Sequence, residues 1–273
     1  MMAEIMTQLL LNIYFWPMFV MVTLLGLIIL PLFLLIQTVF RRRRIDYAIR
    51  YAICVYGWVL VKLVPFFAPV QVQSPTGKLP LPAIMVANHS SAIDPYLFGA
   101  LLADACFFST WAFKIPIYGN MMRFAGYVDA NEGWDMVSRK GAAMLQSGTS
   151  LIIWPEGHRS RDGSLGRFKN GAFALAVQTG FPLLPICIIG AGKFMAPGKS
   201  ILTPSRIKMI LLDPIYPDSN NDPEQEIIKM RNTTRQVILQ ALQDDDDQWG
   251  RGVVQGNARG RAHTRLKEAQ HAD

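Results

Sequence analysis

The sequence has little that could hold a metal ion or form disulfide bonds. It contains three cysteines, Cys54, Cys106 and Cys187, each isolated within an apolar stretch and without the spacing of a metal site or a disulfide framework. Of the four histidines, only His89 and His158 precede the basic C-terminal end of the chain. We therefore predict reduced, buried thiols, no metal site and no cofactor.

Sequence motifs for two other kinds of function are also absent. The sequence has no Gly-x-Ser-x-Gly segment, so a covalent acyl-serine route has no obvious nucleophile. It also has no nucleic-acid-binding motif, although its formal net charge is +7. The positive residues cluster at residues 41–44, in the loop after Trp154 and beyond residue 250. We therefore predict no nucleic-acid partner.

Charge is absent from a long stretch at the N-terminus. No charged residue occurs from Ile5 to Phe40, and Arg41–Arg44 follow at once. A bilayer core takes about 20 helical residues, so the run is long enough to span it and too long for a cleaved signal peptide. The hydrophobic content of 51% and the mean hydropathy of +0.22 agree with a membrane-embedded helical segment. Because arginines favour anionic cytoplasmic headgroups, we expect the following domain on the cytoplasmic face of the inner (cytoplasmic) membrane.

The next segment, Ile45 to Phe67, has a different pattern. Its uncharged core from Tyr51 to Val61 is too short to span a bilayer and lies between Arg50 and Lys62. Its tyrosines and tryptophan suit the headgroup layer. We predict an interfacial helix, hairpinned against the first one; the alternative is a buried helix of the soluble domain.

The remainder of the chain alternates between apolar strands and helical stretches. After a linker from Val70 to Pro82, strands are expected at 83–87, 104–109, 124–129, 150–154, 183–189 and 206–212. Helices are expected at Trp134–Gln146, Gly171–Gln178 and Pro223–Gln243, the last with Asp222 as its N-cap. This alternation predicts an α/β fold with a mostly parallel central sheet flanked by helices.

A histidine and a carboxylate follow the first buried strand at short spacing. His89 and Asp94 lie in a predicted strand-to-helix turn, about one helical turn apart. Histidine titrates near neutrality, and a nearby carboxylate can fix its tautomer and stabilise its charged form. The spacing therefore indicates a base dyad. The alternative is that Asp94, with Ser91, caps a helix and that His89 is an ordinary loop residue.

A glycine-containing basic loop follows the strand that ends at Trp154. Pro155 stops the strand, and four cations then fall among glycines: Arg159, Arg161, Arg167 and Lys169. Glycine lets the backbone approach a ligand closely, and such a loop at the carboxyl end of a strand suits a phosphate or another anion. The alternative is a solvated basic loop without a ligand.

These motifs resemble those of the glycerolipid acyltransferases typified by 1-acylglycerol-3-phosphate (lysophosphatidate) acyltransferase. Four blocks match in order: Asn88 to Pro95; Phe113 to Gly119 with Gly126 to Asp129; Pro155 to Ser160; and Leu184 to Ile188. The resemblance covers about residues 80 to 215, and the first and third blocks are highly specific.

The resemblance implies a role for each matching residue. In the family the histidine is the base, the aspartate orients it and the Glu-Gly-x-Arg block holds the acceptor's phosphate. These roles map onto His89 and Asp94 as catalytic residues and onto Glu156, Gly157 and Arg159 as substrate-binding residues. His158 replaces a usual threonine, a change that we expect to be tolerated.

A second departure affects the acceptor. The family's second block normally continues with an arginine, whereas Ala130 follows Asp129 here. The acceptor's phosphate is then left to the remaining cations: Lys114, Arg123, Arg159 and Lys169. This departure keeps open an acceptor other than lysophosphatidate, such as a lyso-ornithine lipid or a glycolipid.

The sequence thus predicts a membrane-bound O-acyltransferase. We expect it to move a fatty acyl group from acyl-CoA or acyl-ACP to a lysophospholipid hydroxyl, with membrane phospholipids as its surroundings. We expect membrane-anchoring helices at 1–70, the catalytic domain at 71–245 and a basic disordered tail at 246–273. An apolar groove along Tyr96, Leu97 and Phe98 is expected for acyl chains. The competing interpretations are an inactive membrane-anchored lipid-binding or scaffolding protein and, more weakly, a thioesterase.

Overall fold

The structure, a computed structural model, describes residues 2–64, 68–74, 79–110, 112–115 and 118–245. The tail predicted at 246–273 lies outside these residues. The strands form one seven-stranded sheet in the order β1-β7-β6-β2-β5-β3-β4. Their bounds are β1 Val70–Gln73, β2 Ile84–Ala87, β3 Ala105–Ser109, β4 Val128–Asp129, β5 Ser150–Ile153, β6 Leu183–Ile189 and β7 Ile207–Leu211. Every neighbouring pair is parallel except β6 with β7, so the predicted mostly parallel α/β sheet is confirmed.

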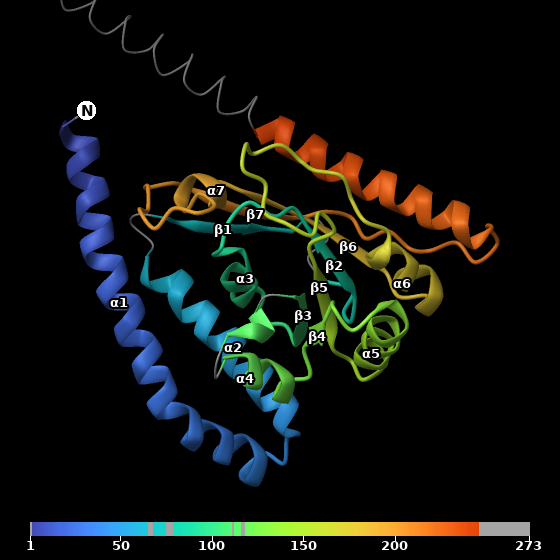
Figure 1. The fold of residues 1–273 in the computed structure, drawn as a ribbon, viewed down its shortest axis with the longest axis horizontal. Coiled ribbons are helices and arrows are strands. Elements are labelled where there is room, and N and C mark those ends of the chain that lie inside the picture. Colours follow the sequence, from blue (N-terminus) through green and yellow to red (C-terminus); the bar gives the residue numbers. More distant parts are fainter. Residues whose placement is uncertain (1, 65–67, 75–78, 111, 116–117, 246–273) are drawn as a thin grey trace, which may run out of the picture.

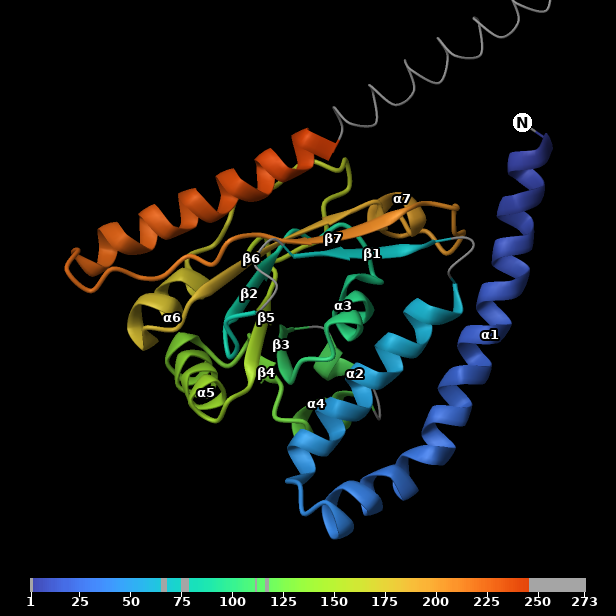
Figure 2. The same ribbon diagram turned by 180° about the vertical axis from the view of Figure 1, so that it is seen from behind.

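Helices cover both faces of this sheet (Figures 1 and 2). The N-terminal helices α1 and α2 lie on one side, and α5, α6 and the helix at residues 223–245 lie on the other. The bounds are α1 Met2–Leu35, α2 Ile45–Leu63, α3 Asp94–Leu97, α4 Tyr118–Phe124, α5 Trp134–Gln146, α6 Gly171–Thr179 and α7 Ala191–Phe194. A π-helical turn, η1 Ile36–Phe40, extends α1, and two 3-10 turns follow, η2 Phe98–Leu101 and η3 Ala112–Lys114. The expected cap of the last helix is present, since the Gln225 amide donates to Asp222 Oδ1 at 3.0 Å.

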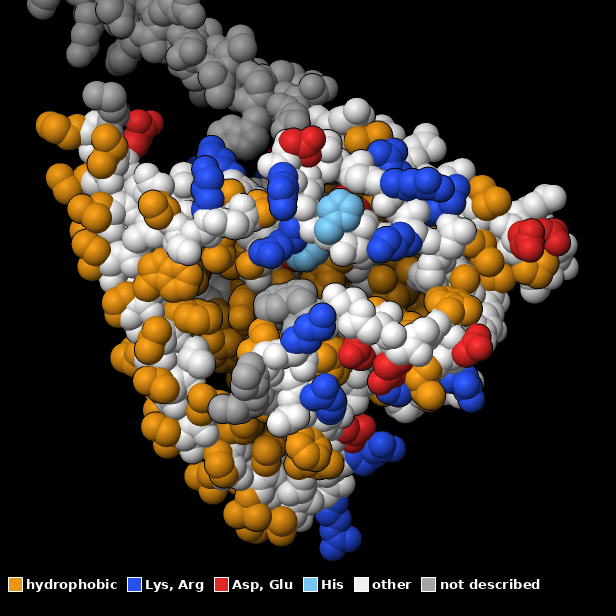
Figure 3. All heavy atoms as spheres, in the orientation of Figure 1, with side chains coloured by type: hydrophobic (Ala, Val, Ile, Leu, Met, Phe, Trp, Pro, Cys, Tyr) orange, Lys and Arg blue, Asp and Glu red, His pale blue; other side chains and the backbone are white. Residues whose placement is uncertain are grey.

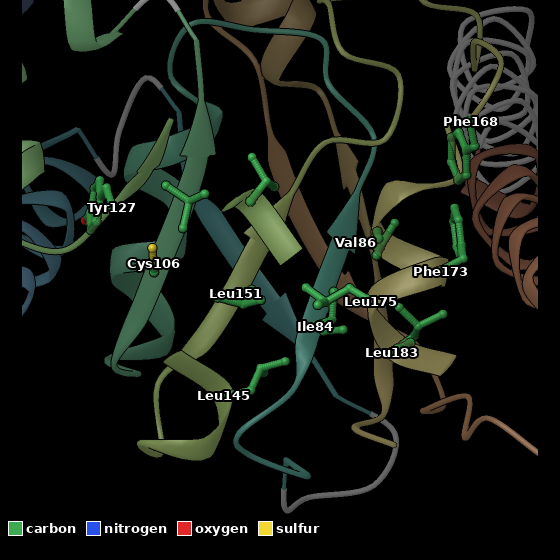
Figure 4. Close-up of a cluster of buried hydrophobic side chains, with 14 of the residues drawn as sticks. Ile84, Val86, Cys106, Tyr127, Leu145, Leu151, Phe168, Phe173, Leu175 and Leu183 are labelled. Carbon is green, nitrogen blue, oxygen red and sulfur yellow. The ribbon is translucent and has the colours of Figure 1, made fainter. Parts of the chain in front are cut away.

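The central strands are buried on both faces, which explains their continuous apolar runs. Ile84 and Val86 of β2 point into one hydrophobic cluster, and the alternate residues Met85 and Ala87 point into the other. Figure 4 shows the first cluster, in which Ile84, Val86 and Leu151 of the sheet face Leu175 of α6. The strand ends therefore project from a rigid double-sided core.

Two strand predictions differ from the structure. The expected linker at 70–82 contains β1, an edge strand that pairs in parallel with β7. The expected strand at 124–129 is reduced to Val128–Asp129, because Phe124 ends α4 and the Ala125 amide still bonds to the Met121 carbonyl. Apolar residues that looked like a strand thus enter the core from the end of a short helix.

The helices α1 and α2 form an antiparallel hairpin, as predicted. The Tyr14 hydroxyl donates to the Leu63 carbonyl at 2.7 Å, and the hydroxyls of Thr23 and Tyr56 lie 2.6 Å apart. Among the described residues, one helix, Met2–Phe40, is long and apolar enough to cross a membrane. Together, α1 and its extension η1 carry many exposed large apolar residues, for example Ile28 at 75% and Phe40 at 76% exposure.

The N-terminal half of α1 is also bonded to the rest of the chain. Asn12 forms two hydrogen bonds of 2.9 Å with the backbone of Leu202, and the Gln8 amide donates to Thr203 Oγ1 at 3.1 Å. Leu11 is fully buried there. This half of the helix therefore lies against the sheet domain and is not an independent span.

The helix α2 packs on the domain as tightly as on α1. An ideal Cβ on Gly99 would lie 2.3 Å from the Trp58 nitrogen, so only a glycine allows the backbones of η2 and α2 to come this close. Arg50, expected at the boundary of an interfacial segment, is 4% exposed and donates two hydrogen bonds to Asp104, at 2.6 and 3.1 Å. Burial would lower the pKa of Arg50, but the hydrogen bond and the charge of Asp104 outweigh it and raise that pKa. The helix is thus fixed to the domain by a buried ion pair.

Candidate active site

His89 lies in the turn between β2 and α3, and hydrogen bonds to β6 and to the end of α7 hold this turn. The Asn88 side chain continues the strand pairing with β6, since it donates to the Ile188 carbonyl at 2.8 Å and accepts from the Ile188 amide at 2.7 Å. The Ser91 hydroxyl donates to the carbonyl of Met195, just after α7, at 2.8 Å. The turn is therefore immobilised on both sides of His89.

The predicted dyad is formed. His89 Nδ1 lies 2.8 Å from Oδ2 of Asp94, whose carboxylate is completely buried. The same oxygen accepts hydrogen bonds of 2.9 Å from the backbone amides of Ser90 and Ser91. Asp94 thus both pairs with His89 and holds the turn, which combines the two interpretations of the sequence. Because a carboxylate only accepts, Nδ1 carries the proton and Nε2 is left for a substrate.

Glu156 has a role that the sequence did not indicate. Its Oε1 accepts the His89 amide at 2.8 Å, its Oε2 accepts the Gly166 amide at 2.9 Å, and the side chain is 2% exposed. The Ser160 amide completes the connection by donating to the His89 carbonyl at 2.8 Å. Both carboxylate oxygens are used by backbone amides, and Glu156 does not line the cavity described below. The residue therefore joins the two loops, whereas the resemblance implied contact with a phosphate.

A cavity of about 950 Å³ opens at His89. Figure 3 shows the molecule hollowed between α1 and the domain, beside the histidine and basic side chains. On one side of His89 its apolar lining comes from the N-terminal helices and α7, including Phe15, Trp16, Phe19, Leu60, Val64 and Phe194. On the other side the lining comes from β3, α4 and α5, including Phe107, Phe108, Met122, Trp134 and Val137. The dyad thus faces a space with apolar walls in two directions.

The basic loop contributes part of its cations to this cavity. Gly157, Arg159 and Lys169 line it, whereas Arg161 and Arg167 are exposed elsewhere and are not among its lining residues. Gly157 has φ +75, and a Cβ there would lie 2.6 Å from Lys169 Nζ. Glycine therefore leaves room for the lysine beside the loop backbone. The two cations thus put positive charge on the wall of the cavity that His89 also lines, an arrangement that suits an anion.

The other two predicted cations lie apart from the cavity lining. Lys114 in η3 is exposed, and Arg123 on α4 is exposed over the Phe113 ring, where it donates to Asn120 at 3.3 Å. Ala130, which stands where the family has an arginine, does line the cavity. The structure therefore brings together His89, Gly157, Arg159 and Lys169 and leaves Lys114 and Arg123 outside.

The expected acyl groove is present only in part. Tyr96 and Leu97 line the cavity, whereas Phe98 is buried against the rings of Phe107 and Trp154 and is not among the lining residues. The contribution of Phe15, Trp16 and Phe19 was missed, because it depends on how α1 packs against the domain. No local sequence signal indicates it.

The stacking of Trp154 on His89 was not predicted from the sequence. The rings of His89 and Trp154 have centroids 4.8 Å apart and planes inclined by 28°. A signal was available, since Trp154 is the last residue before the Pro155-Glu156 block whose loop is bonded to His89.

The fold agrees with the comparisons with known proteins. Residues 70–189 match the family model described as Acyltransferase. Residues 70–189 are therefore similar to this family, and the resemblance of the chain to the glycerolipid acyltransferases is confirmed.

Two sequence relatives and one solved structure are similar to this chain. The chain is 35% identical over 167 residues to the chloroplastic 1-acyl-sn-glycerol-3-phosphate acyltransferase BAT2 of Brassica napus, covering 58% of this chain and 48% of that protein. It is 36% identical over 169 residues to the chloroplastic LPAT1 of Arabidopsis thaliana, covering 58% and 47%. The chain thus spans about half the length of these relatives. The crystal structure of the 1-acyl-sn-glycerophosphate (LPA) acyltransferase PlsC from Thermotoga maritima matches with a TM-score of 0.69 and 25% identity, over 89% of this chain and 98% of that one.

Proposed function

We propose that this protein transfers a fatty acyl group from the thioester of acyl-CoA or acyl-ACP to the free hydroxyl of 1-acylglycerol-3-phosphate, which gives phosphatidic acid. The observation that carries the proposal is the His89–Asp94 dyad, with Nδ1 and Oδ2 2.8 Å apart, at a cavity that Arg159 and Lys169 also line. A base, an anion-binding wall and apolar walls are the three features that such a reaction needs.

The transfer is direct. His89 Nε2 removes the proton of the acceptor hydroxyl as its oxygen attacks the thioester carbonyl, and a tetrahedral oxyanion forms. When this collapses, the new ester remains, the carbon–sulfur bond breaks and the imidazolium returns the proton to the thiolate. Asp94 stabilises the imidazolium and stays ionised. A positioned general base contributes about 10²–10⁴ to such a rate, and the scheme requires no metal ion or cofactor.

The acceptor's phosphate is assigned to Arg159 and Lys169. Arginine offers a forked, charge-assisted pair of hydrogen bonds to a phosphate, and Lys169 adds a point charge beside Gly157. Ala130 on the cavity wall favours a second candidate, an acyltransferase for a lyso-ornithine lipid or a glycolipid. Such an acceptor would not need the cation that the family places at this position.

The protein works at a membrane in this proposal. The exposed apolar side of α1 faces lipid, and the opposite side of the same helix supplies Phe15, Trp16 and Phe19 to the cavity wall. A lysolipid can therefore reach the dyad from the bilayer without crossing water. The arginines at residues 41–44 are assigned to anionic headgroups, which puts the domain on the cytoplasmic face of the inner membrane.

Thiol release by the purified protein tests the proposal. Acyl-CoA and acyl-ACP are each supplied alone, with lysophosphatidate and with lyso-ornithine lipid or a glycolipid acceptor. Release that requires lysophosphatidate supports the proposal, and release that requires a phosphate-free acceptor supports the second candidate. Release without any acceptor indicates a thioesterase. No release under any condition, with a folded protein, supports the lipid-binding or scaffolding alternative.

A further inference from the structure

The indole ring of Trp154 stacks on the imidazole ring of His89. The two ring centroids are 4.8 Å apart. Trp154 also stacks on Phe107, with centroids 5.7 Å apart and planes inclined by 4°, and its ring is nearly perpendicular to that of Phe98, with centroids 6.0 Å apart. The indole is therefore held in one orientation by the core and presents a fixed face to the base.

The polar edge of this indole is not available to a substrate. Its nitrogen is buried and has no hydrogen-bond partner among the described residues. An unpaired buried donor is unfavourable, and a phenylalanine would fill a similar space without that donor. The position is thus occupied by the side chain whose ring face is the most electron-rich of the aromatic residues.

We propose that Trp154 is a positioning residue that stabilises the imidazolium form of His89 through its indole face during acyl transfer. This inference rests on the proposed function, in which His89 becomes a cation as it takes the acceptor's proton. A cation over an indole face is attracted by the ring quadrupole, whereas a neutral imidazole gains much less. The stack therefore favours the step in which His89 becomes charged.

A substitution of Trp154 leaves the charged groups around His89 unchanged. Asp94 bonds to Nδ1, and Glu156 accepts the backbone amide. The other titratable groups along the cavity are Tyr96, Tyr118, Arg159 and Lys169. On α7, Lys193 is next in sequence to Gly192, which packs closely against Ser90: an ideal Cβ on Gly192 would lie 3.1 Å from the Cβ of Ser90. A change confined to Trp154 thus isolates the effect of the stacked ring.

The test compares Trp154→Leu and Trp154→Phe with the wild type. The acid limb of the pH profile of kcat/KM reports deprotonation of the base, and loss of the indole favours the neutral ring. For Trp154→Leu we expect the acid limb to move to lower pH by about half a unit, with kcat about tenfold lower and KM for acyl-CoA little changed. Trp154→Phe is expected to fall between. Trp134→Leu, which removes a tryptophan from the same cavity without a stack on His89, is expected to leave the limb in place.

Two results overturn the inference. An unmoved acid limb in Trp154→Leu shows that the ring only fills space, and a shift to higher pH shows that added water stabilises the imidazolium better than the indole does. An NMR titration of the histidine side chains, with His158 as the internal reference, keeps the test independent of turnover. If the wild type shows no acyl transfer, the proposed function fails, but a lower His89 titration midpoint in Trp154→Leu still supports the stack.

Discussion

The two loops that meet at the cavity are built in opposite ways. In the turn from Asn88 to Asp94, the side chains of Asn88, His89, Ser91 and Asp94 are all hydrogen-bonded within the domain. In the loop after Trp154, the cations Arg161, Arg167 and Lys169 are exposed, and Lys169 also lines the cavity. A base must meet its proton at a defined distance, whereas an anion can be held by side chains that adjust to it. In the proposed function, catalysis and binding are thus separated between a rigid turn and an adaptable loop.

The largest effect is expected from removing the base in the rigid turn. His89→Ala should lower the steady-state rate of acceptor-dependent thiol release by about 10³-fold or more, because it removes the proposed general base, the imidazole that is bonded to Asp94. His158→Ala is the matched control, since His158 is exposed and does not line the cavity. Near-normal turnover by the His89→Ala variant would show that His89 is not the general base.

Asp94→Asn should have the next largest effect. The amide leaves the space filled but loses the charge that stabilises the imidazolium, so kcat should fall by about 10²-fold. Asp135→Asn, in the first turn of α5, is the control for loss of a carboxylate. Equal rates for the two variants would show that Asp94 only caps the turn.

Glu156→Gln tests the junction between the two loops. The new NH₂ group would face a backbone amide, which leaves one donor unpaired and costs about 1–3 kcal/mol of folding free energy. We expect kcat to fall about tenfold with little change in KM for lysophosphatidate, measured together with thermal unfolding. A large rise in KM with unchanged kcat would instead indicate direct contact with the acceptor, as the family resemblance implied.

Arg159→Lys acts on the adaptable loop. Lysine keeps the charge but loses the fork, so KM for lysophosphatidate should rise about fivefold while KM for acyl-CoA changes little. Arg161→Lys, on the same loop but outside the cavity lining, is the control. Identical kinetics for both variants would show that Arg159 does not bind the acceptor's phosphate.

The smallest effect is expected from Ala130→Arg, which adds the family's missing cation to the cavity wall. If the acceptor carries a phosphate, KM for lysophosphatidate should fall by about two- to threefold. If this change has no effect and the wild type prefers a phosphate-free lysolipid, the acceptor assignment fails, and the acyltransferase assignment remains.

What could be predicted from the sequence was local in the chain. The strands from Ile84, Ser150 and Leu183 were found because residues buried on both sides form continuous apolar runs. The dyad was found because His89 and Asp94 lie in one turn. The role of Glu156 could not be predicted in this way, because its partner His89 is 67 positions away and the bond uses a backbone amide.

Packing between distant elements explains the other differences. Phe15 reaches the cavity only because Gln8 and Asn12 bond α1 to residues 202–203. Arg50 was expected only as the boundary of an interfacial segment, but it is buried, and Asp104, more than 50 positions later, pairs with it. Such contacts depend on the assembled fold and leave no periodic pattern in the sequence.

A single-turnover experiment with radiolabelled acyl-CoA and lysophosphatidate tests the central claim most directly. Excess protein is mixed with the donor and the acceptor, quenched at intervals and separated into protein and lipid. In direct transfer by His89, label passes from the thioester to phosphatidic acid without appearing on the protein, and His89→Ala leaves it in the thioester. Label bound covalently to the protein before the lipid is labelled, or normal transfer by His89→Ala, would contradict the account.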